Sequence, residues 1–316
     1  MGVAIGVDVG GTKIAGGVVD EAGAIIARTR RETPSTDPPA IVSTVVSVVQ
    51  ELRQGRAVDA VGVGSAGFVD AARSTVLFAP NLAWRDVPVR DQVVAATDLP
   101  VVVENDANAA AWGEFRFGAA EDVDDMVCVT VGTGIGGGLV LDGAVYRGAH
   151  GIGAELGHMR VVPDGHLCGC GNRGCLEQYA SGPALVREAR ALASAGSVFA
   201  ARLLELAGGD PEMITGQMVT GAARDGDEAS RELLADLGRW LGEGLASFAA
   251  VLDPAVFVIG GGVSAAGELL VGPATAAFRR NLTGHGHRPE AEVRVATLGN
   301  DAGIVGAADL ARIDHR

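Results

Sequence analysis

Three things are scarce in this chain of 316 residues: positive charge, long apolar runs and cysteine. Lys and Arg number 25 against 39 Asp and Glu, which gives a formal net charge of −14. So acidic a chain repels the phosphate backbone of nucleic acid, although single basic residues can still hold a small phosphorylated ligand. The longest apolar runs, such as 41–49, are broken by Ser and Thr and fall short of the ~20 residues that cross a bilayer. We therefore expect neither a nucleic-acid partner nor a membrane partner.

The four cysteines are unevenly placed. Cys168, Cys170 and Cys175 fall within eight positions, whereas Cys128 lies in an apolar run that predicts inert packing. The first residues show neither a basic leader nor a long apolar segment, so we predict a cytoplasmic protein. Thiols stay reduced in that compartment, which argues against a disulfide as the reason for the cluster.

Apolar β-runs alternate with helical patterns along the chain. This alternation predicts an α/β fold, and the length favours two domains at roughly 150 residues each. The predicted strands are 3–9, 13–19, 24–31, 60–63, 101–103, 126–131 and 256–259, and the predicted helical regions are 40–53, 107–115, 183–207, 228–252 and 302–313.

An internal repeat links the two halves. The segment VDVGGTKIAGGVVD at 7–20 aligns without gaps to VTVGTGIGGGLVLD at 129–142, and each reads as a strand, a glycine turn and a returning strand. The alternative is chance agreement between two hairpins rich in Gly and Val. The preferred interpretation is two related half-domains that face each other across a cleft, each presenting a glycine turn to it.

Three glycine clusters, at 10–11, 132–138 and 260–262, follow predicted strands. Glycine lets backbone N–H groups approach an anion closely, and Thr and Lys side chains add donors. One such turn alone is ordinarily only a tight hairpin, but three predict a nucleotide gripped from several sides. Asp8, at the end of a buried strand, suits the water shell of Mg²⁺ beside a polyphosphate. The predicted nucleotide-binding residues are Asp8, Gly10, Gly11, Thr12, Lys13, Gly132, Thr133, Gly134, Gly136, Gly261 and Gly262.

The cysteine cluster has the composition of a metal site. Together with a histidine, three thiolates suit tetrahedral structural zinc, and the glycines between them let the backbone curl around an ion. The alternative is free structural thiols, and His166 is a rival for the fourth position. The predicted ligands are His158, Cys168, Cys170 and Cys175.

These motifs are not those of the P-loop, because GxxxxGK[ST] is absent, nor of the dinucleotide fingerprint, because Gly132 lies in a hairpin. DVGGTK, VENDANAAAWGE, the cysteine cluster and GGGVSAAGELL instead resemble the ROK family of sugar kinases, in particular its ATP-dependent bacterial glucokinases, over essentially the whole chain. The resemblance implies the actin/hexokinase-like (ribonuclease H-like) fold, with two related α/β domains around a cleft. The smaller domain would be 1–105 plus 301–316, and the larger 106–300, with the zinc loop and helices for oligomerisation.

Asp106 is the predicted catalytic residue. Taken alone, it is most simply an N-cap for the alanine-rich helix that follows. The resemblance implies that it is the base that accepts the sugar hydroxyl proton, which contributes about 10²–10⁴-fold, and that Asn105 holds a sugar hydroxyl.

Further sugar contacts are implied by the resemblance. Glu155 and His158 are three residues apart and share one face of a helical turn. The resemblance favours His158 over His166 as the zinc ligand, and its second ring nitrogen would then face the sugar. Glu155 and Glu177 have an alternative interpretation as solvated surface charges. The full set expected to bind sugar is Gly67, Asn81, Asn105, Asp106, Glu155, His158 and Glu177.

The resemblance thus implies a glucokinase that transfers the γ-phosphoryl group of ATP to the 6-hydroxyl of glucose, as a homodimer or homotetramer. The alternatives are another hexose (mannose, fructose or N-acetylmannosamine) or polyphosphate as donor. Two alternatives are not sugar kinases. A sugar-responsive regulator is disfavoured because Asp8 leaves no room for a preceding helix-turn-helix. A filament-forming ATPase is disfavoured because it would have no use for the cysteine cluster.

Overall fold

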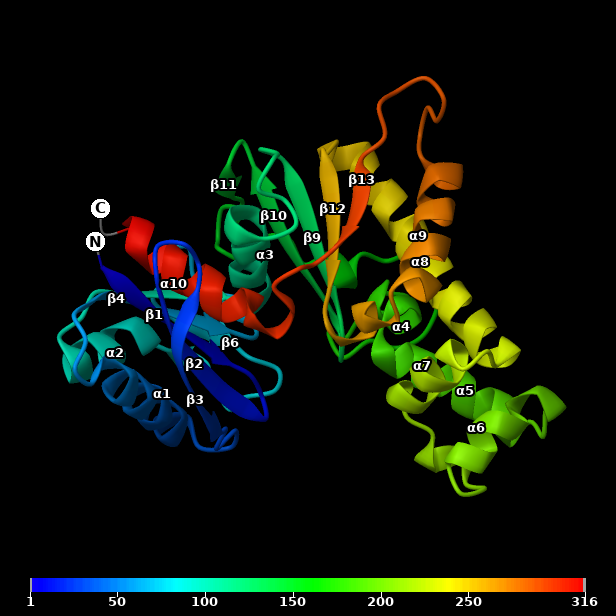
Figure 1. Ribbon diagram of the computed structural model, residues 1–316, viewed down its shortest axis with the longest axis horizontal. Coiled ribbons are helices and arrows are strands. Elements are labelled where there is room, and N and C mark those ends of the chain that lie inside the picture. Colours follow the sequence, from blue (N-terminus) through cyan, green and yellow to red (C-terminus); the bar gives the residue numbers. More distant parts are fainter. Residues whose placement is uncertain (1, 315–316) are drawn as a thin grey trace. The chain divides into compact units, whose positions relative to one another are not determined.

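The computed structural model describes residues 2–314, and the chain divides into two compact units (Figure 1). Unit 1 is built from the described parts of 1–128, 137–154 and 297–316, and unit 2 from 129–136 and 155–296. The chain therefore returns to unit 1 at residue 297 for its last helix. The division at 105/106 and 300/301 that the sequence suggests stays a prediction about functional domains.

A five-stranded sheet in the order β3-β2-β1-β4-β8 lies at the centre of unit 1. β1 pairs antiparallel with β2, and β2 with β3, whereas β4 runs parallel to both β1 and β8. Because β1, β4 and β8 are parallel, these three strands end at the same edge of the sheet. The bounds are β1 (Val3–Val9), β2 (Lys13–Val19), β3 (Ile25–Glu32), β4 (Val58–Ser65) and β8 (Val101–Asn105).

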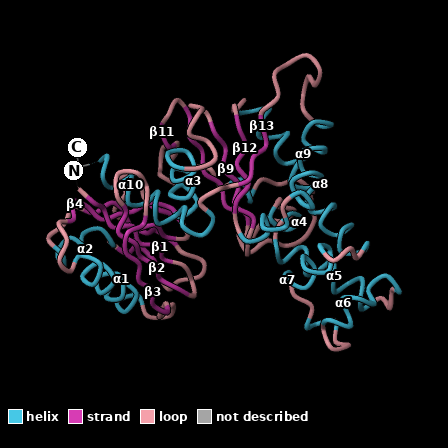
Figure 2. Tube along the Cα trace, viewed as in Figure 1, coloured by secondary structure: helices cyan, strands magenta, loops and turns pink. Residues whose placement is uncertain are grey.

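Helices cover both faces of this sheet (Figures 1 and 2). Ile5 and Val7 point to the face covered by α1 (Pro38–Arg53) and α2 (Val89–Thr97), whereas Ala4 points to the face covered by α10 (Ala302–Asp314). This alternation follows from the period of two along a strand. A Cβ at Gly6 or Gly62 would overlap carbonyl oxygens of α10, so that helix lies in backbone contact with β1 and β4. On its other side α10 packs against α3 (Asp106–Phe117).

A small antiparallel sheet adjoins the loop after β4. Its order is β5-β6-β7, with bounds β5 (Phe68–Val69), β6 (Val76–Phe78) and β7 (Arg85–Val87). Trp84 is fully buried beside it and donates its indole N–H to Pro38 O at 3.3 Å.

The second five-stranded sheet repeats the first. Its order is β11-β10-β9-β12-β13, so three successive strands are again followed by two that come later in the chain. This topology confirms the repeat predicted from 7–20 and 129–142. The bounds are β9 (Met126–Val131), β10 (Ile135–Leu141), β11 (Ala144–Val145), β12 (Val256–Gly260) and β13 (Glu292–Val295).

Helices make up most of unit 2. α8 packs along α9, and a Cβ at Gly242 would overlap Ala274 O, which shows how closely the two helices approach. Within residues 2–314 we find no helix with the length and apolar character needed to cross a bilayer. The bounds are α4 (Glu177–Ala180), α5 (Gly182–Ser194), α6 (Ala201–Leu206), α7 (Gly216–Arg224), α8 (Glu228–Leu252) and α9 (Glu268–Asn281), with 3₁₀ turns η1 (Leu156–His158), η2 (Val198–Ala200), η3 (Pro211–Met213) and η4 (Gly262–Ala266). A further 3₁₀ turn, η5 (Gly299–Asp301), belongs to unit 1 and directly precedes α10.

Candidate active site

The first glycine turn joins β1 to β2 in unit 1. Gly10 donates its N–H to Lys13 O at 3.0 Å, and the Thr33 hydroxyl donates to Gly10 O at 2.7 Å. Gly11 lies against Asn81, because a Cβ there would come within 2.9 Å of the Asn81 Cβ. The structure thus brings the predicted nucleotide turn next to a residue predicted to bind sugar.

Two carboxyl groups of unit 1 have raised pKa values. Burial, reinforced by the negative charge of Asp106, raises the pKa of Asp8 to about 6, although Lys13 opposes the shift. Burial also raises the pKa of Asp106, against hydrogen bonds from its own backbone N–H and from that of Ala107. Paired carboxyl groups with raised pKa values are typical of sites that bind a cation or move a proton.

Asn105, and not Asp106, caps α3. Asn105 Oδ1 accepts from Asn108 N at 3.0 Å, and its Nδ2 donates to Gly67 O at 3.0 Å. Asp106 is the first residue of α3, and its Oδ1 accepts from Ala107 N at 2.9 Å. The interpretation of Asp106 as the N-cap is therefore wrong. The cap role falls to its neighbour, because asparagine and aspartate are equally good caps and the position is set by where β8 ends.

Glu104 holds the junction between β8 and α3 in place through its side-chain contacts. Its side chain is 3% exposed, and Oε1 accepts from Asn105 N and from Asn108 Nδ2, both at 3.1 Å. Oε2 is paired with Arg147 at 2.7 Å and with Arg73 at 3.2 Å. Such a buried carboxylate with two cations and two hydrogen bonds holds the start of α3 in one place. Sequence reasoning assigned no role to Glu104, because its partners are distant in the chain.

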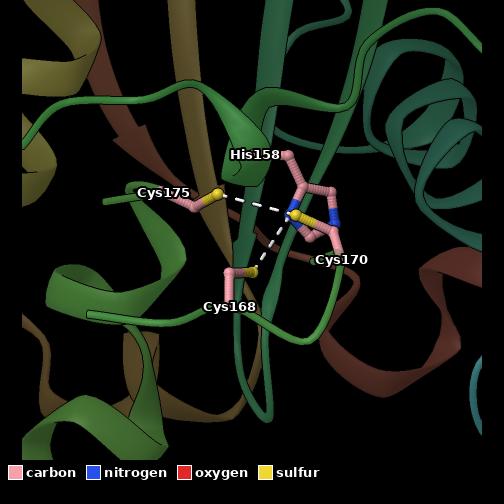
Figure 3. A group of neighbouring side chains, drawn as sticks. All are labelled: His158, Cys168, Cys170 and Cys175. Carbon is pink, nitrogen blue, oxygen red and sulfur yellow. Dashed lines mark hydrogen bonds between the residues drawn. The ribbon is translucent and has the colours of Figure 1, made fainter. Parts of the chain in front are cut away.

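The predicted zinc ligands converge in unit 2 (Figure 3). One ligand atom from each of the four residues lies within 4.8 Å of every other. Cys170 Sγ is 3.7 Å from Cys175 Sγ, and Cys168 Sγ is 3.6 Å from His158 Nδ1. A tetrahedron with zinc–sulfur bonds of 2.3 Å has edges of about 3.8 Å, so the residues present fit a zinc ion.

His158 is placed between the cysteines and a carboxylate. Its Nδ1 faces Cys168, and its Nε2 lies 3.9 Å from Glu155 Oε2 across the η1 turn. One ring nitrogen is thus available to a metal while the other faces Glu155. The rival His166 lies outside the four-residue group and instead packs against Tyr179 in a tilted arrangement, with ring centroids 5.3 Å apart.

The second and third glycine turns also lie in unit 2. Gly132 N donates to Gly134 O at 2.9 Å within the turn, and Glu177 Oε2 accepts from Ile135 N at 3.1 Å. Gly261, with φ of +84°, lies against the end of β9, because a Cβ would overlap Val131 O. Gly136 lies past the turn, as the second residue of β10.

A cavity of about 1500 Å³ opens beside these two turns. Helices α5 and α7 form much of its wall, and it contains the ion pair Arg190–Glu212 at 2.9 Å. The helical residues were missed from the sequence, because no glycine turn or motif marks them. Lining residues include Gly132, Thr133, Gly262, Thr215, Gln217 and Arg224.

The predicted site residues therefore form two groups. Unit 1 holds the first turn with Asp8, Gly67, Asn81, Asn105 and Asp106, and unit 2 holds the other turns, the metal ligands, Glu155 and Glu177.

Comparison with known proteins adds to this geometry. A model described as "ROK family" matches residues 4–313. The chain belongs to the ROK family.

Relatives within the ROK family match nearly the whole chain. The glucokinase of Streptomyces coelicolor is 51% identical over 312 residues, which cover 99% of this chain and 98% of the relative. A crystal structure of a ROK family glucokinase from Streptomyces griseus in complex with glucose and AMPPNP shares 53% identity, with a TM-score of 0.90 over 99% of this chain and 100% of that one. The predicted family and the α/β, actin-like sugar kinase fold are confirmed.

A solved structure of lower identity also matches the whole chain. The inorganic polyphosphate/ATP-glucomannokinase from Arthrobacter is 27% identical, with a TM-score of 0.64 and full coverage of both chains.

Proposed function

We propose that this ROK protein is a glucokinase, which transfers the γ-phosphoryl group of ATP to the 6-hydroxyl of glucose and yields glucose 6-phosphate and ADP. The observation that carries the proposal is the 53% identity, over nearly the whole chain, to a glucokinase whose structure holds glucose and AMPPNP. The two groups of site residues described above supply the chemistry that this reaction requires.

Asp106 is the proposed base. Its raised pKa, caused by burial, makes it a better proton acceptor than an exposed aspartate. As the glucose 6-oxygen forms its bond to the γ-phosphorus, the hydroxyl proton passes to Asp106, and the bond to the β-phosphate oxygen breaks to release ADP. Glu104 keeps the start of α3 in place for this step through its bonds to Asn105 and Asn108.

Sugar orientation is the role we assign to Asn105, Gly67 and Asn81 of unit 1 and to Glu155, His158 and Glu177 of unit 2. Carboxylates accept hydrogen bonds from adjacent sugar hydroxyls. His158 Nε2 lies beside the Glu155 carboxylate, so both can address the same sugar. Asn105 already uses its amide as a cap and as a donor to Gly67, so a sugar hydroxyl would share Oδ1 or compete for Nδ2.

The nucleotide would lie against the glycine turns, with its nucleoside in the cavity beside α5 and α7. Backbone N–H groups at such turns bind phosphate oxygens. Asp8 is the residue that would hold Mg²⁺ through its water shell, and the ion would supply charge neutralisation on the phosphates when bound. Zinc would be structural, held by His158 and the three cysteines. A cytoplasmic homodimer or homotetramer stays a prediction.

A coupled assay across a panel of sugars and donors tests the proposal. We expect turnover with glucose and ATP to exceed that with mannose, fructose or N-acetylmannosamine at equal concentrations, and polyphosphate to be the poorer donor. A preference for polyphosphate over ATP, or for another hexose over glucose, would replace the proposed substrate pair and keep the reaction class. Absence of phosphoryl transfer from every donor would contradict the proposal itself.

A further inference from the structure

Two segments that carry metal ligands contact the second glycine turn at one residue, Ile135. We call them the two arms of the metal-binding loop: one contains Gly157 and His158, and the other contains Cys175 and Glu177. The backbone N–H of Ile135 donates to Glu177 Oε2 at 3.1 Å. From the other arm, Gly157 lies so close that a Cβ would overlap the Ile135 carbonyl oxygen. Ile135 is itself buried, and Glu177 gives its N–H a hydrogen-bond acceptor there. The end of the turn is therefore fixed between two segments that are 20 residues apart in the chain.

Each of these contacts lies beside a metal ligand. Gly157 directly precedes His158, and Glu177 follows Cys175 by two residues. The Cys168 sulfur lies 3.8 Å from Glu177 Oε1, the oxygen that does not bond to Ile135. An ion held by His158 and the cysteines would join these two segments and so hold both of their contacts with Ile135 in place.

The turn is shaped to receive this carboxylate. A Cβ at Gly134 would overlap Glu177 Oε2, so any larger residue there would push the carboxylate away. At the other end of the turn, Gly182 N donates to Gly132 O at 2.9 Å, which ties it to the start of α5. With both ends fastened, the two N–H groups between them, those of Thr133 and Gly134, are held in place for an anion, and preorganisation of this kind raises affinity.

We propose that Glu177 is a positioning residue for the nucleotide: it fastens the turn from Gly132 to Ile135, and metal binding, by joining the two arms, sets nucleotide affinity. This role is separate from the sugar contact considered above, and it rests on the proposed function in one respect, that the turn holds the phosphates of ATP. The turn, Glu177 and the metal ligands all lie in unit 2.

Calorimetric titration with AMPPNP, in the absence of sugar, tests this role. Glu177→Ala removes the acceptor for Ile135 N and should bind AMPPNP about tenfold more weakly, which corresponds to one lost hydrogen bond. Glu177→Gln retains an acceptor oxygen and should stay within about threefold of wild type. Glucose affinity, measured separately, should fall in both variants, because the proposed sugar contact needs the carboxylate. A merely structural role would not separate the two ligands in this way.

Tyr179→Phe is the matched control. Tyr179 lies on the same short helix, and its hydroxyl accepts from His166 N at 3.0 Å, away from the turn. We expect its AMPPNP affinity to equal that of wild type. Removal of zinc from the wild-type protein by a chelator should weaken AMPPNP binding, and added Zn²⁺ should restore it.

Two results would overturn the inference. If Glu177→Ala or the chelated protein binds AMPPNP as tightly as the wild-type protein, the turn does not depend on this loop, and the proposed kinase function stands. If wild-type protein with zinc fails to bind AMPPNP at all, the proposed function fails and this inference fails with it. The wild-type titration alone therefore distinguishes the two failures.

Discussion

Replacing Asp8 by asparagine should stabilise the protein while it damages activity. Burial and the charge of Asp106 raise the pKa of Asp8 from its ordinary 3.8 to about 6. The folded state therefore binds a proton on the Asp8 carboxylate more tightly than the unfolded state does. Asp8 contributes stability below pH 4, and this contribution is lost as the pH rises through about 6. The difference in pKa, at 1.36 kcal/mol per unit, corresponds to about 3 kcal/mol at pH 7.5.

Because an asparagine does not titrate, Asp8→Asn escapes this loss. We expect its free energy of unfolding, measured by urea denaturation without nucleotide or Mg²⁺, to exceed that of wild type by about 3 kcal/mol more at pH 7.5 than below pH 4. About half of this difference falls between pH 5 and pH 7.5. Turnover should drop in the same variant, because the proposed partner of Mg²⁺ is gone. Asp91, a carboxylate whose side chain is 70% exposed, provides the matched control in Asp91→Asn, which should change stability by less than ~0.5 kcal/mol. A pH-independent difference between Asp8→Asn and wild type would refute the reasoning.

Three further outcomes are expected. Glu104→Gln should destabilise the fold by about 3 kcal/mol in thermal or urea unfolding, at the low end for loss of one partner of a buried pair, because the half-buried guanidinium groups of Arg73 and Arg147 lose this carboxylate while Arg73 keeps Asp314; an unchanged midpoint would show that the cluster is dispensable. Chelation should lower the melting temperature of the wild-type protein and should have a much smaller effect on a variant that already lacks Cys170, and equal shifts in both would argue against a metal at this site. Gly62→Ala should destabilise by at least the 1–3 kcal/mol typical of overpacking, because the added Cβ meets Ala307 O, whereas Gly221→Ala provides the comparison at a glycine of α7 where an added Cβ meets nothing within 4 Å.

The sequence predicts those parts of the structure that are formed by residues close together in the chain. The hairpins at 7–20 and 129–142 carry a strong pattern of Val and Gly, and both appear as predicted. The metal cluster was equally local, because three of its ligands lie within eight residues. The strands β5 to β7 were missed because runs of two or three residues hold too little periodicity to be recognised.

The rest depended on contacts between distant segments. Asn105 and Asp106 are equally good caps on paper, and the structure decides between them only because β8 ends at Asn105. The role of Glu104 needs Arg73 and Arg147, which lie far away in the chain. The bond from Ile135 to Glu177 joins residues 42 positions apart and leaves no mark in either local sequence.

The most direct measurement of the central claim is the formation of glucose 6-phosphate from glucose and ATP, followed by phosphorus NMR, for the wild-type protein and for Asp106→Ala. We expect glucose 6-phosphate from the wild-type protein. For the variant we expect a loss of turnover of at least about 10²-fold, with glucose binding still measurable by calorimetry. Near-normal turnover by Asp106→Ala, or no glucose 6-phosphate from the wild-type protein with its metal in place, would contradict this claim.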